Sequence, residues 1–142
     1  MKKQPRTNEI DEHRTFEVVR AFANEMKAHL DAEFNADGIQ RLEEFIERIR
    51  FSSEEIEEID YLRFGSGAFL GQCLVEMFGG KWWDGYDSVM IDDRIQIFVF
   101  SQVAKQFTSG LNDSVFYKFT VVRQMLEMRQ KPTPTKAEDP TL

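Results

Sequence analysis

Cysteine and long apolar runs are both scarce in this sequence. Cys73 is the single cysteine, and no stretch approaches the roughly 20 predominantly apolar residues that a helix needs to cross a bilayer. One cysteine excludes an intrachain disulfide and a zinc site built from several cysteines. The basic residues 1–6 also lack the apolar segment of a secretory signal peptide. These absences predict a protein of the cytoplasm.

Positive charge is scarce as well. The chain has 18 Lys and Arg against 25 Asp and Glu, which gives a formal net charge of −7. Nucleic acids and anionic membranes bind clusters of Lys and Arg, so this balance argues against both kinds of partner. A basic protein partner is compatible with it, although acidity is also the commonest state of a soluble protein and more often reflects solubility alone.

Histidine is limited to His13 and His29, sixteen positions apart on one predicted helix. At 1.5 Å of rise per residue, about 24 Å separates them. They cannot bind one metal ion together, so we interpret both as solvated helix residues.

The chain does contain apolar residues at helical spacing. This periodicity predicts a first helix over about 9–32 and a second over about 38–50, with Asp37 as the N-cap of the second. Ser52 and Glu55 have the spacing of a capping box, which predicts the start of a third helix.

The stretch over residues 64–83 predicts a buried central helix that the rest of the chain surrounds. Its apolar side chains alternate with Gly67, Ala68 and Gly71, and Gly79-Gly80 can end it in the left-handed conformation. Glycine within a helix costs about 1 kcal/mol relative to alanine, so we predict a break near residues 63–66.

The pattern becomes extended after residue 80. Short β-rich runs over 81–83, 88–91 and 94–100, separated by turn residues, predict an antiparallel meander. The last run is apolar on both faces at its far end, which predicts a central strand. Ser101 can then cap a short helix that Gly110 ends, and a final helix is predicted over about 113–130.

This order of elements predicts an α+β fold. We expect N-terminal helices and a central glycine-containing helix packed on a small antiparallel β-meander, followed by two C-terminal helices. With 142 residues the chain can bury a sizeable core. We therefore predict a single domain over 9–130, between a flexible N-terminus (1–8) and a disordered tail (131–142).

Three short motifs lie between residues 67 and 114. They are Gly67-Ala68-Phe69-Leu70-Gly71-Gln72, then Phe78-Gly79-Gly80-Lys81-Trp82, and Phe100-Ser101-Gln102-Val103-Ala104-Lys105 with Gly110 and Asp113-Ser114. Together they resemble a family of small bacterial α+β proteins of unknown function, which carry a G-x-x-L-G-E helix, a G-G-x-W start of a strand and a P-F-x-x-V segment. The resemblance covers about residues 35–120. It implies this fold and a bacterial origin, and it carries over no activity.

The chain departs from this family pattern at two positions. Gln72 stands where the family helix has its acid, and Val99 stands where the family has proline. If the family acid has a chemical role, Gln72 puts that role in doubt here.

Four aspartates in the predicted meander are the strongest candidates for chemistry. Closely placed carboxylates can bind a hard cation or act as an acid–base pair, because proximity separates their proton affinities. Turn aspartates also hydrogen-bond the local backbone, which is the common structural role. The residues are Asp84, Asp87, Asp92 and Asp93. They support an alternative function as a small metal-dependent or acid–base hydrolase.

Two other reactive side chains have structural interpretations. Ser66 lies between two glycines, but no strand precedes it, so neither a nucleophile elbow nor a dinucleotide-binding loop is supported. Cys73 lies on the apolar face of the central helix, which is typical of a small core side chain.

An aromatic and acidic surface is the other candidate site. Trp83 and Tyr86 occupy the turn after the first predicted strand, although a helical layer could cover both. The candidate partner-binding residues are Trp83, Asp84, Tyr86, Asp87, Glu54, Glu55 and Glu58. We expect a non-enzymatic protein-binding module without a cofactor, such as a toxin-neutralising immunity protein or a secretion chaperone, that binds a basic partner. Self-association through an apolar helix face is a third hypothesis.

Overall fold

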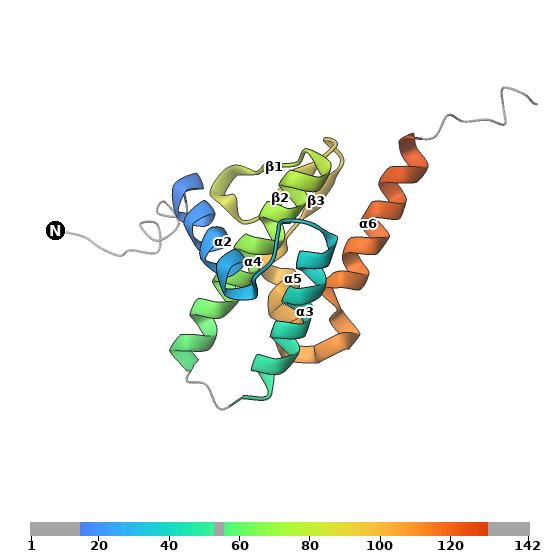
Figure 1. Ribbon diagram of the computed structural model, residues 1–142. Coiled ribbons are helices and arrows are strands. Elements are labelled where there is room, and N and C mark those ends of the chain that lie inside the picture. Colours follow the sequence, from blue (N-terminus) through green and yellow to red (C-terminus); the bar gives the residue numbers. More distant parts are fainter. Residues whose placement is uncertain (1–14, 53–55, 131–142) are drawn as a thin grey trace, which may run out of the picture.

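The computed structural model describes residues 15–52 and 56–130 (Figure 1). Five α-helices lie within these residues: α2 (Phe16–Leu30), α3 (Ala36–Arg50), α4 (Ile56–Phe78), α5 (Val99–Ser109) and α6 (Val115–Gln130). A three-stranded antiparallel sheet contains β1 (Lys81–Trp82), β2 (Val89–Ile91) and β3 (Ile95–Ile97). Two 3-10 turns cover Asp84–Tyr86 and Gly110–Asp113. The fold is therefore α+β, as the sequence predicts.

Some predictions concern parts of the chain that are not described. The predicted flexible N-terminus, the start of the first helix over 9–14 and the predicted disordered tail all lie outside the described residues. Glu54 and Glu55 also lie outside them, and the side chain of Glu58 is not described. None of the described helices has the length and apolar character needed to cross a membrane.

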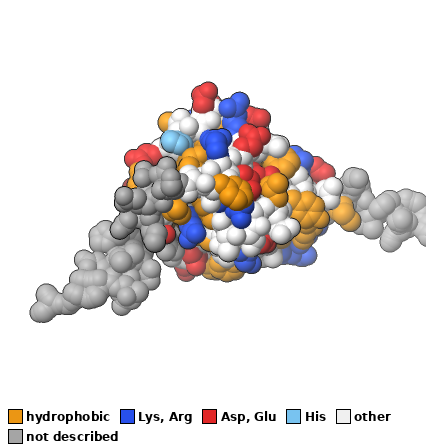
Figure 2. Space-filling view, turned by 90° about the horizontal axis from the view of Figure 1, so that it is seen from below, with side chains coloured by type: hydrophobic (Ala, Val, Ile, Leu, Met, Phe, Trp, Pro, Cys, Tyr) orange, Lys and Arg blue, Asp and Glu red, His pale blue; other side chains and the backbone are white. Residues whose placement is uncertain are grey.

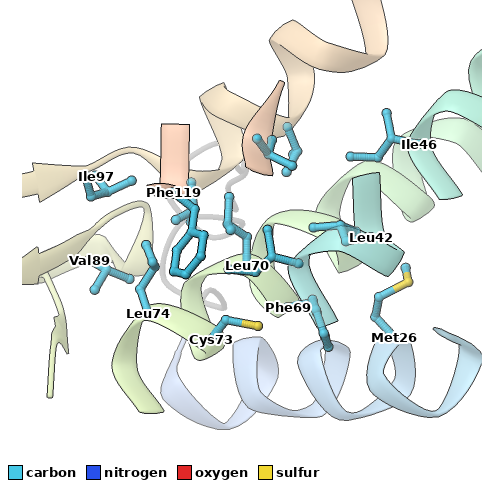
Figure 3. Packing of buried hydrophobic residues seen from close by; sticks show 14 of the residues in the cluster. Met26, Leu42, Ile46, Phe69, Leu70, Cys73, Leu74, Val89, Ile97 and Phe119 are labelled. Carbon is cyan, nitrogen blue, oxygen red and sulfur yellow. The ribbon is translucent and has the colours of Figure 1, made fainter. Parts of the chain in front are cut away.

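Helix α4 is the centre of the fold, with α2 on one side, α3 on the other and the sheet beside its C-terminal half (Figure 1). All ten residues from Gly65 to Leu74 are buried. Figure 3 shows how Leu70 and Leu74 of this helix meet Val89 and Ile97 of the sheet and Phe119 of α6. A helix that is enclosed on every side is apolar all round, which explains its glycine-rich and apolar composition.

The predicted break at residues 63–66 is wrong, because α4 runs unbroken from Ile56 to Phe78. Two of its three glycines, Gly67 and Gly71, allow aromatic rings to approach the backbone. A Cβ atom built at Gly67 lies 2.3 Å from the Phe100 ring, and one built at Gly71 lies 2.1 Å from the Trp82 ring. Packing against these rings compensates for the low helix propensity of glycine.

Two helix starts differ from the prediction. The N-cap of α3 is Asn35, whose Oδ1 accepts a hydrogen bond from the amide of Gly38 at 2.8 Å. Asp37 instead lies in the first turn, where its carboxylate pairs with Arg41 at 3.0 Å. Helix α5 begins at Val99 rather than after Ser101, and Gly110 follows its last residue, as predicted.

The antiparallel meander is confirmed, but its last strand is shorter than predicted and is not central. The strand order is β1-β2-β3, so β2 is the central strand. Val99 and Phe100 already belong to α5, and Phe100 packs on α4. The apolar residues on both faces of the predicted strand thus mark the start of a helix.

Side chains of α3 and α5 hold the start of α6. Glu43 Oε1 accepts hydrogen bonds from Ser114 Oγ at 2.5 Å and from the amide of Phe116 at 3.1 Å. Gln106 is fully buried, and its Nε2 donates to Glu47 at 2.8 Å while its Oε1 accepts from the amide of Val115 at 2.8 Å. These bonds satisfy amide groups of the first turn of α6.

Candidate functional site

The meander presents different side chains on its two faces. Trp82, Val89 and Ile97 are aligned by the strand register, and all three pack in the core. Side chains alternate between the two faces along a strand. The residues that follow Trp82 and Ile97, and the residue that precedes Val89, are therefore expected to point outward. The backbone supports this extension of the register, because the amide of Trp83 donates to the carbonyl of Ser88 at 2.9 Å. Trp83 and Ser88 therefore share the outer face, and we infer from its place directly after Ile97 that Phe98 lies on the same face.

Two large side chains of this outer face are exposed to solvent. Trp83 is 47% exposed and Phe98 is 48% exposed, whereas Ser88 between them is fully buried. Met90, partly buried, belongs to the same outer set. We call Trp83, Met90 and Phe98 the Trp83 face.

Polar contacts fix the surface between the two rings. Ser88 Oγ donates a hydrogen bond to Asp87 Oδ1 at 3.2 Å and accepts one from Gln96 Nε2 at 2.9 Å. These contacts satisfy the buried hydroxyl and hold Asp87 beside the Trp83 face. The apolar pair thus lies on a preorganised part of the sheet.

The turn after β1 separates its two aromatic side chains. Gly85 (φ 79°) and Tyr86 (φ 52°) both adopt left-handed backbone conformations, and the amide of Tyr86 donates to the carbonyl of Trp83 at 2.8 Å. The Tyr86 side chain packs, partly buried, against Val19, Ala23 and Ala68. Trp83 therefore faces solvent, while Tyr86 contributes to packing against α2 and α4.

Aspartates outnumber basic residues in the segment that carries the Trp83 face. Asp84, Asp92 and Asp93 are exposed, and Asp92 forms an ion pair with Arg129 of α6. The segment 81–98 has the four aspartates against Lys81 and Arg94, a net charge of −2, and Arg129 offsets one of these negative charges.

The aspartates do not form a metal site in this structure. Within residues 15–52 and 56–130, no group of three or more His, Cys, Asp and Glu side chains is arranged to hold a metal ion. The hydrolase alternative requires Asp84 and Asp87 to share a concave site. Neither the hollow between Phe16 and Glu76 nor the one between Phe22 and Tyr61 includes them.

Sequence reasoning missed Phe98 because it assigned the residue to a covered central strand. The available signal was the spacing of Val99, Val103 and Phe107, which are buried in α5 and fit a helix that begins immediately after Phe98. Phe98 is thus the residue at which the strand pattern of β3 ends and the helical pattern of α5 begins.

Cys73 is fully buried, and burial raises the pKa of its thiol well above the usual range, although the nearby backbone of Asn35 acts in the opposite direction. At pH 8 the folded protein therefore holds a neutral, enclosed thiol. We expect iodoacetamide to modify Cys73 at least about a thousandfold more slowly in the native protein than in denaturant, because access requires opening of the core. Mass spectrometry of timed samples measures both rates. Comparable rates in the two conditions would contradict this placement of Cys73.

Figure 2 shows the molecule from below the view of Figure 1. On this side, hydrophobic side chains are interspersed with charged side chains of both signs. Comparison with protein-family models, curated proteins and solved structures finds no match for this chain.

Proposed function

We propose that this protein is a non-enzymatic, cytoplasmic protein-binding module whose contact surface is the Trp83 face. The single observation that supports this is the pair Trp83 and Phe98, both about half exposed, on either side of the buried Ser88. Tryptophan and other aromatic side chains are the preferred anchors of protein interfaces. A toxin-neutralising immunity protein or a secretion chaperone has the small size and acidic balance of this chain.

Burial of this pair can supply a substantial part of the energy of binding, and the rest of the interface must supply the remainder. The exposed parts of the two rings amount to roughly 200 Å². At about 25 cal/mol per Å², their burial contributes up to about 5 kcal/mol before the costs of association are subtracted. The surrounding aspartates add attraction to a basic partner, which accelerates association and weakens as salt rises.

The experiment first captures partners from cytoplasmic extract of the source organism at low and at high salt, and then measures binding with the purified partner. We expect Trp83→Ala and Phe98→Ala each to raise the dissociation constant at least about tenfold. We expect Asp84→Asn to slow association and to reduce its salt dependence. Calorimetry gives the affinities, and stopped-flow fluorescence gives the rates.

Tyr117→Ala is the matched control, because Tyr117 is a 67%-exposed aromatic residue on α6. It should leave the affinity unchanged. A partner whose binding is lost with Tyr117→Ala but not with Trp83→Ala contradicts the proposed surface. A complex whose affinity is the same at both salt concentrations contradicts the electrostatic contribution.

A further inference from the structure

A hollow of about 250 Å³ lies between α2 and α4, away from the Trp83 face. Phe16, Arg20 and Asn24 recur every four residues and so line one side from α2, while Gln72 and Glu76 line the other side from α4. Phe34, from the connection between α2 and α3, completes the lining. Two aromatic rings and four polar side chains therefore converge on one space.

Gln72 is the fixed element of this hollow. Its side chain is largely buried at 7% exposure; its Oε1 accepts a hydrogen bond from Trp82 Nε1 at 3.3 Å, and its Nε2 donates to Glu76 Oε2 at 3.2 Å. The Trp82 contact sets the orientation of the carboxamide, so its amino group is aimed at Glu76. Gln72 thereby positions the Glu76 carboxylate at the hollow.

Opposite charges face this space from the two helices without pairing. Among the described residues, the Arg20 guanidinium has no carboxylate partner, and its recorded contact is with the Phe16 ring, 5.7 Å from the ring centroid. Glu76 has no cationic partner there and accepts its hydrogen bond from Gln72. Arg20 and Glu76 thus leave room for a ligand that carries both charges.

We propose that this hollow binds a free α-amino acid, with its carboxylate on Arg20 and its ammonium group on Glu76. Arginine recognises carboxylates through parallel N–H donors, and a carboxylate accepts from an ammonium group. Asn24 and Gln72 supply further polar contacts to the head group, and the rings of Phe16 and Phe34 favour an apolar side chain.

The volume sets the size of the ligand. A cavity of roughly 150 Å³ holds benzene, which has six non-hydrogen atoms. By that scale, about 250 Å³ holds about ten, which corresponds to leucine or methionine. The hollow is open to solvent, so we expect a dissociation constant on the order of 0.1–1 mM.

The test titrates each of the twenty free amino acids singly into the ¹⁵N-labelled full chain and follows the amide shifts by NMR. We expect an apolar amino acid of leucine size to shift amides near Arg20 and Gln72. The N-acetyl derivative lacks the ammonium group and the carboxamide derivative lacks the carboxylate, so each should bind at least about tenfold more weakly.

Substitutions of Arg20 and Glu76 then test whether these two side chains bind the charged groups of the ligand. Arg20→Gln and Glu76→Gln, both at exposed positions, should retain the fold and weaken binding at least about tenfold. Arg48→Gln and Glu44→Gln, at exposed positions of α3, are matched controls and should not change it. The proposal is overturned if no amino acid binds, if the blocked derivatives bind equally well, or if the shifts lie away from the hollow. None of these results depends on the partner-binding function of the Trp83 face.

Discussion

Replacing Gly71 with alanine is expected to lower the free energy of unfolding by about 2 kcal/mol, although alanine is the better helix former by about 1 kcal/mol. The new Cβ lies 2.1 Å from the Trp82 ring, whereas carbon atoms pack at about 3.5–4.0 Å. The indole cannot move away freely, because Gln72 accepts its Nε1 hydrogen bond. Urea unfolding followed by circular dichroism measures the loss.

Gly65→Ala in the same helix is the matched control. The only close contact of its Cβ is the terminal methyl of Met26, at 3.0 Å, which can move at little cost. This variant should be as stable as the parent or more stable, by up to about 1 kcal/mol. Trp82→Phe should relieve part of the Gly71→Ala defect, so the two effects are not additive. A Gly71→Ala protein at least as stable as the parent would show that this close approach does not limit packing.

Gln106→Leu is expected to lower the free energy of unfolding by about 3 kcal/mol while keeping a similar side-chain volume. Gln106 is fully buried and connects Glu47 of α3 to the amide of Val115 at the start of α6. Leucine leaves the Val115 amide without an acceptor and the Glu47 carboxylate with Arg50, at 3.5 Å, as its remaining partner. Each unsatisfied buried group costs about 1–3 kcal/mol.

Gln40→Leu tests whether the substitution type itself has this effect. Gln40 is exposed on α3, so the change should stay within about 0.5 kcal/mol. Denaturant unfolding of both variants gives the comparison. If Gln106→Leu unfolds at the same denaturant concentration as Gln40→Leu, the buried connection makes no net contribution to stability.

The local pattern of the sequence was sufficient to predict the class and most elements of the fold. The helices of residues 16–30 and 36–50 follow from apolar periodicity. The end of α5 at Gly110 follows from the preference for glycine at the ends of helices. Helix α4 was predicted as broken because glycine propensity is a local quantity. The rings of Trp82 and Phe100, which pack against Gly71 and Gly67, come from later in the chain.

The candidate sites were predictable to different degrees. The exposure of Trp83 follows from simple alternation, because Trp82 beside it faces the core. Phe98 depends on where α5 begins, which the extended pattern before it obscures. The hollow at Arg20 and Glu76 depends on the packing of α2 against α4, which the pattern of neither helix contains.

The connections at the start of α6 have a consequence for the order in which the chain assembles during synthesis. The first turn of this helix receives its acceptors from Glu43, 71 and 73 positions before Ser114 and Phe116. Residues of α3 therefore leave the ribosome long before the amides that they will satisfy. Until α6 is synthesised, Glu43 and Gln106 lack these partners. The docking of α6 therefore completes this part of the core after α3 and α5 have already been made.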